Sequence, residues 1–428
     1  MIDLPVSFPR TGEWRRVIAI SMILIGSATI QGICDVLSTT GVVNFGGHRG
    51  VVVLWAIDAG IAVAGIGALS RWVDSVDRRK IGTWMLIAFA LSYLAIWVQT
   101  RDQGAHTLLW GLLGVIDTLQ SNLVVLIAWA LARDLFSEGE AVRLFGLLGG
   151  LAYFGTMAGT GLSAWVAHKA ANTWLLPICV LVALLTAGCV YWLVPAVHRQ
   201  AESITDTDGP TPLGYLWREP TLRALCAVVA GNAVCWTMMS FGVLIALQLA
   251  HPGTGGSLAG AGEMQESYGS LRLIGPIAHA LVQGTISGWL LRKLGYGNLF
   301  LATPLILLLN LVLLGISPGL FAAYAATLLI QFVFGAEGAA AHALLVRVPV
   351  EMRGRVAAWV TGTLPQSGYL LACILLFGAD WLGERLNLSA MGALRISLGL
   401  AMVLAVVNLV AARWLRRTFL TAPPLDVV

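Results

Sequence analysis

"GALSRWVDSVDRRK", residues 67–80, places four cationic and two anionic side chains within ten residues, directly after a long apolar run. In the whole chain of 428 residues only 11% are charged, whereas 58% are hydrophobic. That balance lies outside the range of soluble globular domains. Concentrated charge in such a chain indicates the end of a membrane span.

Twelve apolar segments are nearly free of charge, and each reaches the length of about 18 residues that crosses roughly 30 Å of hydrocarbon. We therefore predict an all-α polytopic membrane protein with twelve transmembrane helices. The first segment is too long for the apolar core of a signal peptide, so we expect it to be the first of these helices. The segments are 17–42, 51–70, 81–99, 107–131, 144–167, 174–194, 222–249, 271–291, 298–316, 320–345, 356–379 and 394–412.

The loops between these segments differ strongly in positive charge. The N-terminus, the C-terminus and every second loop hold 20 Lys and Arg residues, whereas the other loops hold six. Short loops rich in Lys and Arg stay in the cytoplasm. We therefore predict a multi-pass protein of the plasma (inner) membrane with both termini cytoplasmic, in which residues 67–80 anchor the topology.

The start of the opening stretch recurs in the second half of the chain. "GALSR" ends the second span and "GWLLRKLG", residues 288–295, ends the eighth, each with the pattern G-x-L-x-R. Downstream, Arg143 precedes Gly155 by 12 residues, and Arg355 precedes Gly368 by 13. Two six-helix pseudo-repeats explain this order. The predicted domains are an N-terminal bundle over 1–197, a cytoplasmic linker over 198–221 and a C-terminal bundle over 222–428.

Two six-helix halves with these loops resemble the major facilitator superfamily. The stretch 67–80 resembles the loop signature after helix two, although Arg71 replaces an Asp and two later acids supply the negative charge. Gly146, Gly155 and Gly159 have the spacing of the antiporter motif, and Thr160 replaces its Pro. A narrower resemblance is to bacterial relatives of the ATP/ADP translocases, carried by "WALARDLFSEGEAVRLFGLLGG", "GYLWREPTLRALC", "VQGTISGWLLRKLGYGNLFLATPL" and "VPVEMRGRVAAWVTGTLPQSGYLL".

The resemblance implies a cytoplasmic gate built from the charged loops. We expect Arg71 and the acids of the same loop to contact the connection between the fourth and fifth spans, where Glu138 lies. The predicted gate residues are Gly67, Arg71, Asp74, Asp77, Arg78, Asp134, Arg143, Gly288, Arg292 and Arg355.

Ionisable residues inside a membrane span are costly, so they are candidate functional residues. Five lie clearly within spans, namely Asp35, Asp58, Asp117, Glu337 and His279, and none of these five lies in the third, sixth, ninth or twelfth span. Burial disfavours an ionised carboxyl, so an acid in a wet cavity can exchange a proton during transport. The predicted substrate or proton-coupling residues are Asp117, Asp35, Asp58, Glu337, His279, Gln283, Gln31 and Gln120.

Asp117 is the deepest of these acids. It lies ten residues into its span, which is about 15 Å at roughly 1.5 Å per residue. Gln120 shares its helix face, as Gln31 shares that of Asp35. Alternatively, the acids are structural and hydrogen-bonded, Glu337 extends toward water, and the histidine makes a satisfied polar contact.

Cationic side chains are missing from the interior of the predicted spans. Arg272, expected at the outer mouth of the eighth span, is the nearest candidate, and "HPGTGGSLAGAGEMQESYGS", residues 251–270, is expected to be a mobile loop before it. A diphosphate or triphosphate needs cationic partners. An acidic cavity instead favours protons, cations or a neutral solute.

These observations predict a secondary active transporter of a small neutral or cationic solute that works by alternating access, coupled to protons and inclined toward exchange or export. The alternatives are an exchanger of nucleotides or other anionic metabolites, and a non-transporting receptor or assembly factor. No catalytic or metal-binding motif is found, so we expect no enzyme activity, cofactor or metal. The expected partners are the solute, protons and the bilayer, without nucleic acid, and we expect a monomer.

Overall fold

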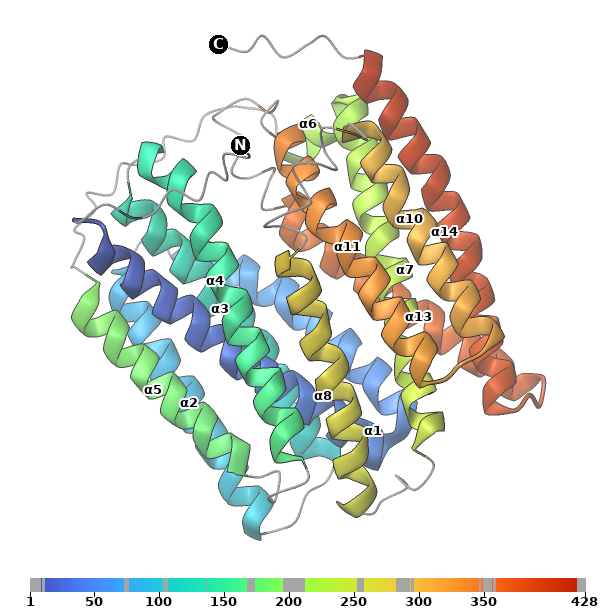
Figure 1. Ribbon diagram of the computed structural model, residues 1–428, viewed down its shortest axis with the longest axis horizontal. Coiled ribbons are helices and arrows are strands. Elements are labelled where there is room, and N and C mark those ends of the chain that lie inside the picture. The colour runs from blue at the N-terminus through green and yellow to red at the C-terminus, as the bar shows by residue number, and fades with distance from the viewer. Residues whose placement is uncertain are drawn as a thin grey trace. The chain divides into compact units, whose positions relative to one another are not determined.

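The computed structural model is all-helical throughout the residues that it describes, which are 9, 12–72, 77–102, 107–136, 138–167, 174–194, 212–251, 258–281, 293, 296–345, 348, 356 and 359–421 (Figure 1). Seven helices in these ranges are long and apolar enough to cross a membrane by length and composition. The predicted fold class is confirmed.

The first two predicted spans form one continuous element. Helix α1 covers Trp14–Trp72, and its helical backbone is interrupted at Gly47, with φ of 63° and ψ of −170°. A residue with a side chain is strained at such a positive φ, which glycine adopts readily. Gly47 therefore ends the first span and begins the second without a separate loop. The next helices are α2 (Arg78–Asp102), α3 (Thr107–Leu135), α4 (Glu138–Val166) and α5 (Leu175–Leu193).

The second half repeats this order of long helices. A short helix, α6 (Pro212–Arg218), precedes α7, and a π-helical turn, η3 (Trp359–Thr363), leads into α13. The long helices are α7 (Pro220–Ala250), α8 (Leu258–Leu281), α10 (Tyr296–Ile316), α11 (Leu320–Leu345), α13 (Leu364–Arg385) and α14 (Ala390–Thr421).

The expected mobile loop before the eighth span is wrong for its larger part. Helix α8 begins at Leu258, so residues 258–270 are helical. The segment is rich in glycine, which disfavours an isolated helix. Its glycines make close contacts instead: a Cβ on Gly262 would lie 3.0 Å from the carbonyl oxygen of Ala167, and a Cβ on Gly269 would lie 3.0 Å from the Cβ of Ala164. Packing against α4 thus overrides the local propensity.

The chain forms two compact units. Unit 1 comprises Met1–Leu54, Ile61–Ile204 and Gly253–Pro276, and unit 2 comprises Trp55–Gly60, Thr205–Pro252 and Ile277–Val428. Most of α8 therefore packs within unit 1, although it follows α7 in sequence. The predicted domain boundaries stay a prediction.

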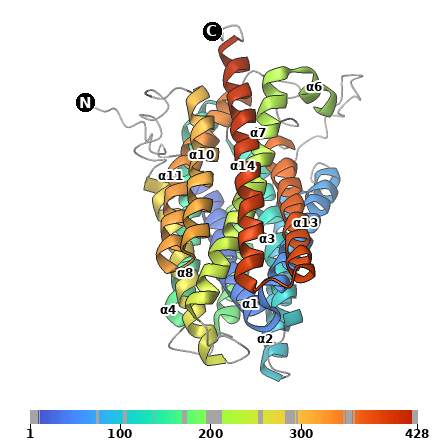
Figure 2. The same cartoon turned by 90° about the vertical axis from the view of Figure 1, so that its right-hand side faces the viewer.

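Each unit has its own apolar core. In unit 1, residues such as Ile20, Ile127 and Leu144 join α1, α3 and α4, and α2 lies beside α5 (Figure 1). In unit 2, Leu225 and Phe300 belong to the core that α7, α10 and α14 share, and these three helices lie side by side (Figure 2).

The internal repeat is visible in the contacts of single glycines. In unit 1, α4 approaches α1 through Gly155, where a Cβ would collide with the backbone carbonyl of Ile25. In unit 2, α13 approaches α7 through Gly368, where a Cβ would lie 3.0 Å from the carbonyl oxygen of Ala230. These are the two glycines that the sequence pairs. Small residues of this kind let membrane helices pack closely.

Candidate functional site

The five membrane ionisable residues fall into different units. Asp35 and Asp117 lie in unit 1, whereas Asp58, His279 and Glu337 lie in unit 2. The structure therefore contains two groups of candidate residues, one in each unit.

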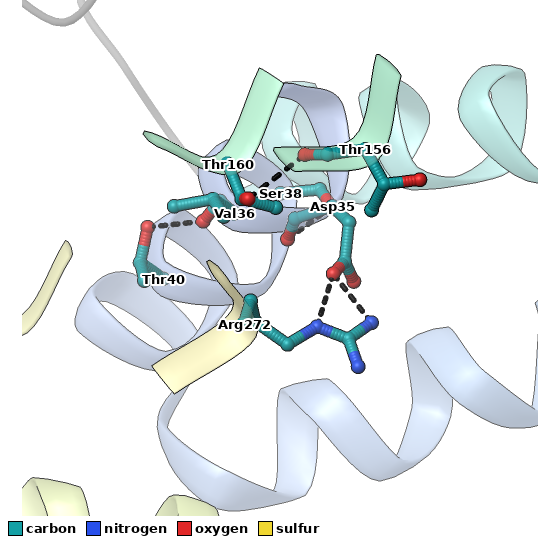
Figure 3. A network of polar contacts seen from close by, with 7 residues as sticks. All are labelled: Asp35, Val36, Ser38, Thr40, Thr156, Thr160 and Arg272. Carbon is teal, nitrogen blue, oxygen red and sulfur yellow. Dashed lines mark hydrogen bonds and ion pairs between the residues drawn. The ribbon is translucent and has the colours of Figure 1, made fainter. Parts of the chain in front are cut away.

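Asp35 forms an ion pair with Arg272 (Figure 3). The Nε and Nη2 atoms of Arg272 lie 2.6 Å and 2.5 Å from the same carboxylate oxygen, Oδ2. The pair joins α1 to α8, and its side chains are 23% exposed for Asp35 and 43% for Arg272. Nearby, the hydroxyl groups of Thr40 and Thr160 donate to backbone carbonyls of their own helices.

Arg272 lies 14 residues after the first residue of α8, a distance of about 21 Å along a helix axis. It is therefore well inside a helix, whereas its expected place at the outer mouth of the eighth span stays a prediction. The cation missing from the predicted span interiors is therefore present in α8, and it pairs with an acid that the sequence did identify.

Asp117 lies in α3 and is buried, with 6% of its surface exposed. It interacts electrostatically with Arg272. Gln120, one turn further along, is fully buried, and its Nε2 donates to Oγ of Ser27 at 2.8 Å. Gln120 therefore ties α3 to α1. Gln31, one turn before Asp35, is exposed.

Glu337 is the centre of a buried polar cluster in unit 2. Its carboxylate accepts hydrogen bonds from Nδ2 of Asn232, at 2.7 Å, and from the hydroxyl group of Thr303. Asn408 completes the cluster, because its Nδ2 donates to Oδ1 of Asn232 at 2.6 Å. The four residues come from α11, α7, α10 and α14. With 6% exposure, Glu337 does not extend toward water, so that alternative is wrong.

The three neutral residues of this cluster are not among the site residues predicted from the sequence. Asn232, Thr303 and Asn408 lie inside apolar spans and are 4%, 0% and 3% exposed. The prediction was based on ionisable residues, and these three side chains are uncharged. A signal was present: three uncharged hydrogen-bonding residues on spans whose other residues are mainly apolar.

The polar ties of the two units correspond to one another. In unit 1, Ser27 on α1 accepts from Gln120 on α3; in unit 2, Asn232 on α7 donates to Glu337 on α11. A glycine precedes each of the first two residues. A Cβ on Gly26 would collide with Thr186 of α5, and one on Gly231 would collide with Asn408 of α14. The amide of Gln120 and the carboxyl of Glu337 thus occupy equivalent places in the repeat.

The remaining predicted residues of unit 2 have simpler surroundings. His279 is partly buried, and its Nδ1 lies 3.2 Å from Oε1 of Gln331 on α11. Asp58 interacts electrostatically with Cys373 of α13. Gln283, expected to share the face of His279, lies outside the described residues.

The predicted cytoplasmic gate contains one well-defined ion pair. Nη1 of Arg78, at the start of α2, lies 2.9 Å and 2.7 Å from the two carboxylate oxygens of Asp134 near the end of α3. The side chains are 13% and 7% exposed. Asp77 instead accepts from the backbone N–H of Arg79 at 3.0 Å and caps α2. Arg16 of α1 adds a second pair with Glu140 of α4, at 2.9 Å.

For several other predicted gate residues, the structure does not describe the side chain or the whole residue. The backbones of Gly67, Arg71 and Arg143 are helical, but the surroundings of these residues are not described. The remaining residues lie outside the described ranges: Asp74, Gly288, Arg292 and Arg355.

Comparisons with known proteins identify the family. The sequence profile of the Major Facilitator Superfamily matches residues 20–373. The chain belongs to this superfamily. A comparison with curated proteins finds no match for the chain.

Solved structures of the superfamily share the fold. The crystal structure of the nucleoside transporter NupG has a TM-score of 0.69 and 12% identity, covering 92% of this chain and 98% of its own. A bacterial homologue of the human lysosomal transporter Spinster, crystallised in an inward-facing and occupied conformation, has a TM-score of 0.65 and 14% identity, covering 97% of this chain and 100% of its own. The predicted superfamily is therefore confirmed, and these neighbours are not ATP/ADP translocases.

As a member of this superfamily, the chain is a multi-pass membrane transporter. Its described residues hold no group of three or more His, Cys, Asp or Glu side chains that could bind a metal ion. Its candidate machinery consists instead of the acids of unit 1 around Arg272, the Glu337 cluster of unit 2, and the Arg78–Asp134 pair.

Proposed function

We propose that this transporter moves a small neutral or cationic solute by alternating access, coupled to protons, and that it works as an exchanger or exporter. The observation that carries the proposal is the charge balance in unit 1. Two acids, Asp35 and Asp117, interact with one arginine, and Arg272 already forms a direct ion pair with Asp35. This group therefore brings two carboxyl groups together with one guanidinium.

This charge balance bears on the class of substrate. A diphosphate or triphosphate needs several guanidinium or ammonium groups that are not already neutralised. Arg272 could bind such an anion only after its ion pair with Asp35 is broken. Exchange of an anionic metabolite, the alternative of the ATP/ADP translocase type, is therefore less favoured. A region with more carboxyl groups than guanidinium groups instead favours a protonated amine or a proton over an anion, and a neutral solute would leave its charge unchanged.

In this proposal Asp117 is the central coupling or cation-binding acid. It is nearly inaccessible, it lies on a long apolar helix, and it interacts with the arginine that holds Asp35. A buried carboxyl that loses and regains a proton on opposite sides of the membrane couples transport to the proton gradient. Asp35 and Asp58 are the reserve candidates. We further propose that the transporter works in the inner membrane as a monomer with both termini cytoplasmic.

The experiment that tests the proposal has two stages. A thermal-shift screen of the purified protein at two pH values, with neutral, cationic and anionic solutes, first identifies a ligand. Transport of that ligand is then measured in proteoliposomes with and without a pH gradient. Stabilisation by anionic metabolites alone, with exchange that ignores the pH gradient, would replace this proposal with the anion exchanger. Ligand binding with no transport under any gradient would instead favour a receptor.

Replacement of Asp117 by asparagine separates the two roles of this acid. Asp117→Asn preserves the shape of the side chain and removes its exchangeable proton. If Asp117 couples, gradient-driven accumulation is lost while counterflow persists; if it binds a cation, ligand binding itself falls. Glu219→Gln is the matched control, because Glu219 is an exposed acid at the start of α7. Normal pH-dependent accumulation by Asp117→Asn would exclude Asp117 as the coupling acid, and Asp35 and Asp58 would then be the candidates.

A further inference from the structure

The first part of α8 packs on α4 along a single face. Gly262 and Gly269 bring the α8 backbone close to Ala167 and Ala164. Between these two glycines, Nε2 of Gln265 donates to the backbone carbonyl of Ser163 at 3.1 Å. The α8 residues are spaced by three and four positions, which places them on one side of a helix. α8 therefore approaches α4 closely at two glycines, and one hydrogen bond between them joins the two helices.

The same part of α8 binds α1 through a pair of polar contacts. Tyr268 shares a side-chain hydrogen bond with Thr39. One turn further along, Arg272 pairs with Asp35, and its guanidinium lies 5.8 Å from the centre of the Tyr268 ring. The arginine is thus held from two directions, by the carboxylate and by the aromatic face.

A proline follows one turn after the ion pair. Pro276 lies inside α8. Proline has no N–H, so the backbone carbonyl of Arg272, four residues earlier, lacks its usual helical donor. Proline is among the few identifiable causes of a helix kink. Pro276 is also the last residue of the segment that packs in unit 1, and Ile277 belongs to unit 2.

We propose that residues 262–272 of α8 form a reversible latch on α1 and α4, fastened by the Asp35–Arg272 ion pair and hinged at Pro276, which closes access to the membrane acids from the predicted outer side. The proposal rests on alternating access as the proposed function. A latch of this kind must release easily. The observed contacts suit that requirement, since Gly262 and Gly269 meet α4 without side chains of their own and the ion pair is partly exposed, where such pairs are individually weak.

The latch also gives Arg272 a role distinct from substrate recognition. When the latch is closed, Arg272 neutralises Asp35 and acts on Asp117. When it opens, α8 carries the guanidinium away, and the acids of α1 and α3 lose their positive neighbour. Opening therefore makes this region more attractive to a cation or proton arriving from the same side, which links access to binding.

Disulfide trapping tests the latch without measuring transport. A Cβ on Gly161 of α4 would lie 3.7 Å from both methyl groups of Leu273, an ordinary contact distance. In a cysteine-free background, Gly161→Cys with Leu273→Cys should cross-link under mild oxidant, whereas each single-cysteine variant should not. Arg272→Gln, added to the pair, should slow cross-linking several-fold. Arg101→Gln, which removes an arginine whose guanidinium lies over the Trp97 ring, is the matched control and should leave the rate unchanged.

Two further measurements complete the test. The charge-exchange variant Asp35→Arg with Arg272→Asp should restore a substantial part of the cross-linking rate, because the ion pair is re-formed in reverse. In proteoliposomes, the oxidised double-cysteine protein should stop transporting and recover after reduction. An equal cross-linking rate with and without Arg272→Gln, or undiminished transport by fully cross-linked protein, would overturn the latch. Failure to find any transported solute would count against the proposed function and leave the cross-linking result intact.

Discussion

Two glycines of α4 allow a matched test of the helix packing. At Gly155 a Cβ would collide with the backbone carbonyl of Ile25 and lie 3.0 Å from the Cβ of Ala28, whereas at Gly150 a Cβ would meet nothing within 4 Å. Gly155→Ala and Gly150→Ala therefore introduce the same methyl group into the same helix in opposite surroundings. A backbone carbonyl cannot rotate away as a flexible side chain can, so α4 and α1 must separate in the first variant only.

The expected sizes follow from these surroundings. Overpacking a close contact costs about 1–3 kcal/mol. Alanine in place of glycine inside a helix contributes up to about 1 kcal/mol of stability. Gly155→Ala should therefore lose about 1–2 kcal/mol after the helix gain is included, whereas Gly150→Ala should gain up to about 1 kcal/mol. The helix gain is common to both variants, so their stabilities should differ by the overpacking cost alone, about 1–3 kcal/mol.

The assay is unfolding of the purified protein in mixed micelles with increasing SDS, followed by tryptophan fluorescence. The repeat supplies an independent copy of the test, because Gly368→Ala on α13 should behave as Gly155→Ala does, and Gly378→Ala as Gly150→Ala does. A Cβ on Gly378 would meet nothing within 4 Å. Equal midpoints for Gly155→Ala and Gly150→Ala would refute the argument that α1 and α4 meet through their backbones.

Three further predictions concern the buried polar cluster, the gate and the topology. Asn232→Ala should lower the free energy of unfolding by about 1–3 kcal/mol, because it leaves buried polar atoms without a partner. Thr237→Ala, which removes a hydroxyl that donates to a backbone carbonyl within α7, should cost less. Equal losses in SDS unfolding would contradict this prediction. Arg78→Gln should increase labelling of cavity cysteines from the cytoplasmic side with expression unchanged, and Lys80→Gln, at an exposed position, should not; equal labelling would leave Arg78 as a topology anchor. A single cysteine at residue 76 should react with impermeant reagents from the cytoplasm, and reaction from the outside would invert the predicted orientation.

The sequence predicts the helices well because the membrane imposes a length and a composition on each of them. It also finds the ionisable residues that the apolar spans contain, including Asp35, Asp117 and Glu337. Both kinds of prediction depend on one segment at a time, so no knowledge of its neighbours is needed.

Partners are harder to predict because they depend on packing between distant segments. Asp35 and Arg272 lie 237 residues apart in sequence, and nothing local to either one specifies the other. The start of α8 was misread for the same reason, since its glycines are stable in a helix only against α4. The cluster around Glu337 was not predicted because asparagine and threonine are uncharged. Their importance becomes clear only from the hydrogen bonds that they form with residues of other helices.

The matching ties of the two units have a consequence for the response of the chain to pH. A glycine followed by a small polar residue, Gly26–Ser27 in one half and Gly231–Asn232 in the other, meets the same neighbouring helices in both. Two halves built on one plan therefore use a glutamine in one joint and a glutamate in the other, side chains that fill nearly the same space. Only the carboxyl can ionise, so a change of pH would act on the joint of unit 2 and leave the joint of unit 1 as it is.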